Sequence, residues 1–167
     1  MAEILTLDGQ QLSDDWIVLA DDAAATGHSH IIVSLQRWQT EHAALKAGGS
    51  AVGVQLDNTL DVLSLPESVL QADLIALNFP AFTDGRAYSQ ARLLRERLQY
   101  SGPIRACGDV LHDQLFYMAR CGFDQFQRPQ NLDDADLKKA LATFSIAYQP
   151  TRSGPQVGDA GILKSAR

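Results

Sequence analysis

The sequence predicts an α/β protein with an open parallel sheet of about five βα units, arranged as a flavodoxin-like three-layer sandwich. Apolar, β-branched runs alternate with helix-length segments from about residue 31 to residue 145. The run 74–79 is continuously apolar up to Asn78, which is typical of a central parallel strand. Because such alternation requires right-handed crossovers, the strands should be parallel. A half-barrel is the alternative architecture.

The first 30 residues precede this alternation and predict an N-terminal extension. Asp8-Gly9 separates two short runs, 4–7 and 10–12, and this dipeptide is a strong turn signal for a β-hairpin. Residues 16–20 form another short apolar run, and we expect a strand there. The small and polar residues 21–27 then predict a loop.

The βα units follow in order. Strands are expected at 31–33, 52–56, 74–79, 104–107 and 123–127, and helices at 35–47, 86–100, 111–121 and 132–144. Ser34 can cap the first helix, and Gly122 should end the third in a left-handed conformation. A short helix or turn is expected before Pro66. Residues 31–148 are predicted to form a single domain, and residues 149–167 a flexible tail.

Composition places the chain among globular proteins. It has 167 residues, 46% of them hydrophobic and 20% charged, so it can fold without disulfides or metal. The net charge of −6 argues against nucleic acid as a partner. No apolar run is long enough for a membrane span, and the start does not resemble a signal peptide, so we expect a cytoplasmic protein without a membrane partner. The oligomeric state is not predicted.

Charge is unevenly distributed along the chain. Residues 1–80 contain eleven acidic and two basic residues, whereas residues 81–167 contain nine acidic and twelve basic residues. One interpretation is an acidic face for a basic partner together with a basic pocket for an anion. The other is that the two halves pair with each other or are solvated.

Several common site motifs are absent. The sequence has no P-loop and no Cys-x-x-Cys pair, and its glycine cluster at 48–53 follows a helix, which is the wrong order for a dinucleotide-binding loop. His28 and His30 could bind a metal with Asp21 and Asp22, but a polar loop is the simpler interpretation. Cys107 is either a reactive thiol or a structural one. We expect no metal and no cofactor.

Ligands of open α/β sheets bind beyond the carboxyl ends of the strands. The richest such segment is 79–88, where Arg86 lies in the first turn of a predicted helix and opposes the helix dipole. A guanidinium beside free backbone N–H groups makes a candidate anion site. The candidate catalytic residues are Asp84, Arg86 and Asp109. The candidate ligand-binding residues are Asn78, Thr83, Gly85, Tyr88, Gly108, Asp113 and Arg128.

A structural alternative explains the same residues. Arg86 could form a buried salt bridge with Asp84, Asp109 or Asp113 that locks the loops together. Asp109 could likewise cap the helix that begins near Leu111, or act as an acid or base beside Arg86. The sequence leaves these alternatives open.

Long strings carry a family resemblance: Phe82-Thr83-Asp84-Gly85-Arg86, Gly108-Asp109-Val110-Leu111 and Arg120-Cys121-Gly122-Phe123-Asp124. Over roughly residues 30–145, the chain resembles family 934 of the bacterial domains of unknown function. Members are often encoded beside the haemoprotein of assimilatory sulfite or nitrite reductase, and some are labelled oxidoreductases. The resemblance implies that the haemoprotein or its electron donor is a partner.

Three functions follow as hypotheses. The first is an accessory protein of sulfite reduction, and hence of sulfur assimilation, that docks on the reductase or its electron donor and has an anion-binding rim. The second is a small enzyme or anion-binding protein that uses Asp84, Arg86 and Asp109. The third is an FMN-type electron carrier, although Ser34-Leu35-Gln36-Arg37 is a poor match to a flavodoxin phosphate loop.

Overall fold

The computed structural model describes residues 3–7 and 10–128, which form one α/β fold. All strands belong to one eight-stranded sheet. They are β1 (Glu3–Thr6), β2 (Gln11–Ser13), β3 (Ile17–Val18), β4 (His30–Ser34), β5 (Ala51–Leu56), β6 (Leu74–Phe79), β7 (Ile104–Gly108) and β8 (Gln125–Gln127). The α-helices are α1 (Leu35–Ala47), α2 (Arg86–Glu96) and α3 (Leu115–Cys121), and the 3-10 helices are η1 (Val62–Ser64), η2 (Glu67–Gln71) and η3 (His112–Gln114).

The strand order corrects the predicted topology. From β3 to β8, neighbouring strands are also consecutive in sequence, and every pair among them is parallel. A flavodoxin-like sheet reverses direction once along its order, and this sheet does not. The flavodoxin-like prediction is therefore wrong. The structure has the half-barrel order, and the predicted N-terminal hairpin is present as the antiparallel pair β1–β2, with β1 also antiparallel to β8.

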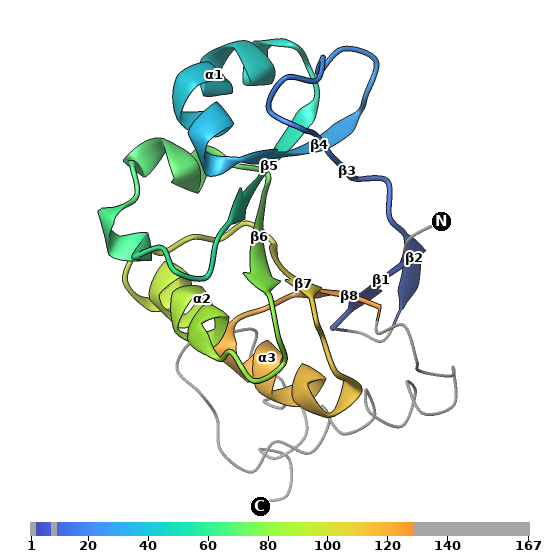
Figure 1. Cartoon of the computed structure of the whole chain (residues 1–167), viewed down its shortest axis with the longest axis vertical. Helices are drawn as coiled ribbons and strands as arrows, with labels where there is room; N and C mark the ends of the chain where they lie inside the picture. Colours follow the sequence, from blue (N-terminus) through green and yellow to red (C-terminus); the bar gives the residue numbers. More distant parts are fainter. Residues whose placement is uncertain (1–2, 8–9, 129–167) are drawn as a thin grey trace, which may run out of the picture.

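The helices of the described residues all cover one face of the sheet, so the predicted three-layer sandwich is also wrong. Right-handed crossovers that always step in the same direction place every connecting helix on the same side. Figure 1 shows α1, α2 and α3 along the outside of a curled sheet. Trp38, Leu94 and Met118, one from each helix, are buried in the main core with Val54, Leu77 and Ala106 of the strands. No helix in the described part of the chain is long and apolar enough to cross a membrane.

The sheet curls until its two edges approach each other (Figure 1). Its edge strands, β2 and β3, are joined directly by Asp14, Asp15 and Trp16. Since a residue extends the chain by at most about 3.6 Å, the four steps from Ser13 to Ile17 span no more than about 14 Å. The segment 14–16, here called the strap, thus brings the two sheet edges close together.

Side chains of the strap fill part of the inner face of the sheet. The guanidinium of Arg105, on β7, is 1% exposed and donates from Nη1 to both carboxylate oxygens of Asp14 at 2.9 and 3.1 Å. Its Nε donates to Gln125 Oε1, on β8, at 3.0 Å. The ring of Trp16 lies 5.9 Å from the Arg105 guanidinium carbon, and Gly53 of β5 leaves the space that this ring occupies. An ion pair and an indole therefore line the inner face.

Most predicted elements are present, with shifted ends. The strand 74–79 and the helix 35–47 have the predicted bounds, and Ser34 caps that helix by accepting the Arg37 N–H. The helix predicted over 86–100 ends at Glu96, because Gln99 takes a positive φ of 56° that turns the buried Tyr100 into the core. The predicted helix 111–121 is divided into η3 and α3. The turn at Asp8-Gly9, the helix 132–144 and the tail 149–167 lie outside the described residues.

Candidate functional site

Most of the candidate residues lie on loops at the carboxyl ends of parallel strands. Residues 57–61 follow β5, residues 80–85 follow β6 and residues 109–111 follow β7. These three strands are adjacent and parallel in the sheet, so their loops lie together at its carboxyl-terminal end. The structure sorts the candidate residues at this end into separate groups.

Asp84 and Arg86 form the first group. Arg86 donates from Nη2 and Nε to the two Asp84 carboxylate oxygens, at 2.6 and 2.9 Å. The Arg86 side chain is 56% exposed, so this is a surface ion pair within one loop and not a buried lock between loops. The hydrogen bond from Arg86 holds the pKa of Asp84 far below its usual value, and the same bond raises the pKa of Arg86.

Asp57 adds a second carboxylate near Arg86. Its Oδ1 accepts from the Thr59 hydroxyl at 2.6 Å and from the Thr59 N–H at 2.8 Å. These hydrogen bonds lower the pKa of Asp57, and Arg86 lowers it further. The buried Gln90, on α2, donates to the carbonyl groups of Asp57 and Leu60 at 2.8 and 2.9 Å, so it ties the β5 loop to α2.

Asp109 contacts the loop that follows β6. Its carboxylate accepts the N–H of Phe82 at 3.0 Å, and its own N–H donates to the Phe79 carbonyl at 2.8 Å. The hydrogen bonds of Arg86 in the described part of the chain go to Asp84. Asp84, Arg86 and Asp109 therefore share an edge of the sheet, but ion pairing joins Asp84 and Arg86 alone.

Asn78 and Gly108 belong to a second group, where β6, β7 and β8 end. The Gly108 N–H donates to Gln127 Oε1 at 3.0 Å. Gly108 has a φ of +89°, and a Cβ there would lie 2.7 Å from Asn78 Oδ1 and closer still to the Phe79 carbonyl oxygen. Only glycine fits this position without a shift of the backbone.

Cys107, which pairs with Asn78 in the sheet register, is not an activated thiol. Burial raises its pKa to about 11, and the nearby Arg105 offsets this only in part. The thiol is therefore protonated at neutral pH. Since the thiolate is the reactive form, the structural interpretation of Cys107 is favoured over the reactive one.

The remaining candidates are dispersed. Gly85 precedes α2, and Thr83 and Asp113 are exposed. Tyr88 packs in edge contacts against Phe79, Tyr117 and Phe123, and its burial raises the pKa of its phenol to about 12. Arg128 forms an ion pair with Glu3, at the β1–β8 side of the sheet.

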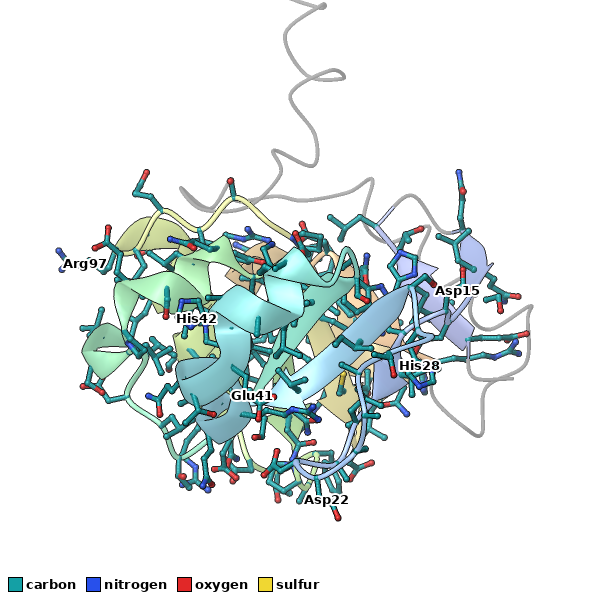
Figure 2. All side chains as sticks on the ribbon, turned by 90° about the horizontal axis from the view of Figure 1, so that it is seen from above. Asp15, Asp22, His28, Glu41, His42 and Arg97 are labelled. Carbon is teal, nitrogen blue, oxygen red and sulfur yellow. The ribbon has the colours of Figure 1, made fainter. Side chains whose placement is uncertain are left out.

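The metal interpretation of the loop before β4 gains no support. Figure 2 shows His28 and Asp22 at well-separated points of this loop. His30 lies against Trp16, with ring centroids 5.2 Å apart. Over residues 3–7 and 10–128, no group of three or more His, Cys, Asp or Glu side chains is placed to hold a metal ion.

The loops at the carboxyl ends of β3, β5, β6 and β7 carry an excess of carboxylates. We call these carboxylates the acidic rim: Asp21, Asp22, Asp57, Asp61, Asp84, Asp109 and Asp113. Over 19–29, 57–61, 80–86 and 108–113, the sequence offers Arg86 as the one arginine and has no lysine. These loops therefore carry a net negative charge, while Arg37 in the first turn of α1 and Arg128 directly after β8 add positive charge at the same end of the sheet.

Sequence reasoning missed residues whose contacts join distant segments of the chain. Asp14 and Arg105 are far apart in sequence and meet only through the curl of the sheet. Phe82 and Gln114 also have no periodicity that would mark them, although Phe82 lies inside the segment that was singled out. Their roles depend on contacts between loops.

Fold and site define the class: an α/β protein with a sequentially wound, curled sheet and an acidic rim at the carboxyl ends of its parallel strands. Within this class, the chain belongs to the family described as "Bacterial protein of unknown function (DUF934)", whose model matches residues 53–157. The resemblance inferred from the sequence is thereby confirmed. No curated protein matches the chain.

Proposed function

We propose that this protein is an accessory protein of assimilatory sulfite reduction that uses its acidic rim to dock on a basic surface of the haemoprotein reductase or of its electron donor. The acidic rim is the observation that carries the proposal. Seven carboxylates stand against one arginine on the loops that follow β3, β5, β6 and β7. Such a field speeds the encounter with a positively charged protein and orients it.

The charge balance favours a protein partner over a free oxyanion. Arg86, the predicted anion ligand, already donates to both oxygens of Asp84, and the charge of Asp57 adds to the rise in its pKa. A sulfite or sulfate ion at Arg86 would have to compete with these carboxylates. The anion-binding rim, the enzyme and the FMN-type electron carrier remain predictions. The excess of carboxylates in the acidic rim favours docking of a basic protein.

Binding of the purified haemoprotein reductase from the same organism tests the proposal. We expect the wild-type chain to bind at low salt, with an association rate that falls steeply as ionic strength rises. Asp61→Asn/Asp113→Asn should slow association and flatten this salt dependence. Glu67→Gln/Glu96→Gln removes the same charge outside these loops and serves as the control.

Two results would count against the docking proposal. One is the absence of binding at low salt to both the haemoprotein and its electron donor. The other is equal slowing by the rim variant and by the control variant, because net charge alone would then explain the association.

A further inference from the structure

Phe82 is an exposed aromatic residue whose backbone is held on both sides by another loop. Its side chain is 50% exposed. Its N–H donates to Asp109 Oδ2 at 3.0 Å, and its carbonyl accepts from Gln114 Nε2 at 3.1 Å. Asp109 follows β7 and Gln114 ends η3, so both groups come from outside the loop that carries Phe82.

These two hydrogen bonds fix the backbone of a residue whose side chain contributes little to the core. A half-exposed ring gains only part of the free energy of burial, so core packing alone does not account for an aromatic side chain at this position. Side-chain and loop ordering is a major cost of association, and a residue that is ordered beforehand avoids it. An exposed aromatic residue on an ordered backbone suits an interface, because aromatic residues are enriched at the buried centres of protein interfaces.

The surroundings of Phe82 indicate the chemistry of what it would bind. Tyr117 is 51% exposed and lies three residues after Gln114, and its ring packs edge-on against Tyr88 at 4.9 Å. The Tyr88 ring in turn lies against Gly85, in the loop of Phe82. The exposed ring of Tyr117 is thus connected, through Tyr88, to the loop that carries Phe82. Carboxylates of the acidic rim lie in the same loops. We call this area the Phe82 surface: Phe82, Asp84, Asp109, Asp113, Gln114 and Tyr117.

We propose that the Phe82 surface is the centre of a protein-docking interface, and that its partner offers an apolar pocket bordered by lysine or arginine side chains. Phe82 would enter the pocket, and the carboxylates of Asp84 and Asp113 would pair with the basic border. The inference rests on the proposed docking function and adds its central contact. It also assigns Asp109 and Gln114 as positioning residues that act through the backbone of Phe82.

The first test uses a probe of the stated chemistry and the full-length, ¹⁵N-labelled chain. An amphipathic peptide of leucine and lysine should shift the amide resonances of Phe82, Asp109, Gln114 and Tyr117, and a leucine–glutamate peptide should not. Phe82→Ala should weaken binding about tenfold or more. Leu12→Ala, which removes a 43% exposed side chain on β2, is the matched control and should change nothing.

Positioning is tested at Asp109. Asp109→Ala removes the acceptor of the Phe82 N–H and should weaken binding, whereas Asp109→Asn keeps an acceptor oxygen and should restore most of it. If the charge of Asp109 were what mattered, both variants would lose affinity equally. Unchanged melting temperatures of the Phe82 and Asp109 variants would exclude unfolding as the cause.

The reductase supplies the second test, in which the two proposals fail separately. If the wild-type chain binds the haemoprotein and Phe82→Ala binds equally well, docking stands and the Phe82 surface is refuted. If the haemoprotein does not bind but the leucine–lysine peptide does so at Phe82, the reductase partner is wrong and the surface stands. Peptide shifts centred elsewhere, or self-association that Phe82→Ala abolishes, would overturn the inference.

Discussion

Asp14 and Arg105 are 91 residues apart in sequence, and the carboxylate of one accepts two hydrogen bonds from the guanidinium of the other on the inner face of the sheet. Both side chains are largely shielded from water, at 16% and 2% exposure. The pair connects the strap, which joins the two sheet edges, to the centre of the parallel sheet. It thereby ties the strap to the inner face of the curled sheet.

Asp14→Ala should destabilise the protein by roughly 3 kcal/mol, because it leaves the Arg105 charge buried without a counter-ion. The double variant Asp14→Leu/Arg105→Met removes both charges and should recover most of the loss. Urea denaturation monitored by Trp fluorescence measures both. If the double variant is as unstable as the single one, the loss of stability comes from the missing ion pair and not from an unpaired buried charge on Arg105.

Gly108→Ala should cost about 3 kcal/mol or more, because a Cβ there would collide with Asn78 and with the Phe79 carbonyl in addition to the strain of its positive φ. Gly49→Ala separates the two causes. Gly49 has a φ of +81° with nothing within 4 Å of the added atom, so we expect about 1 kcal/mol from strain alone. Equal losses in thermal denaturation would contradict the predicted contact.

Arg86→Ala should leave the melting temperature essentially unchanged, because the Arg86–Asp84 pair is exposed to solvent. Calorimetry with sulfite, sulfate and phosphate on the wild-type chain then tests the anion hypothesis independently of stability. A variant that unfolds would restore the structural interpretation of this pair. Anion binding that disappears in a folded variant would instead revive the anion site.

Cys107 should react slowly with iodoacetamide at pH 8, and its labelling rate should rise with pH towards about 11. The raised pKa leaves about a hundredfold less thiolate at pH 8 than a thiol of ordinary pKa would have. Mass spectrometry of the labelled peptides separates Cys107 from the buried Cys121. Fast labelling of Cys107 at neutral pH would contradict the structural role.

Much of the architecture could be predicted because it depends on local patterns. The continuous apolar run of β6, the capped helix α1 and the turn at Gly122 are consequences of periodicity, capping and backbone preference within a few residues. The site segment was also recognisable, because a loop rich in polar residues after a buried strand occurs at the functional edge of α/β sheets.

Strand order and the site's internal contacts could not be predicted in this way. Right-handed crossovers are compatible with a strand order that reverses once, as in flavodoxin, and with a strand order that follows the sequence throughout. The local sequence patterns are the same in both cases. From the sequence, Arg86 could pair with Asp84, Asp109 or Asp113. The structure shows that Arg86 pairs with Asp84, and that the Asp109 carboxylate accepts the N–H of Phe82.

The sequence by itself determined the α/β class, most of the helices and strands, the family and the segment where polar side chains gather. The tertiary structure alone decided the strand order of the sheet, the burial of Arg105 against Asp14, and the hydrogen bond from the Phe82 N–H to Asp109. The physical reason is range. Propensities and periodicity act over a few residues. Hydrogen bonds such as Arg105–Asp14 and Phe82–Asp109 instead depend on which distant segments the folded chain brings together.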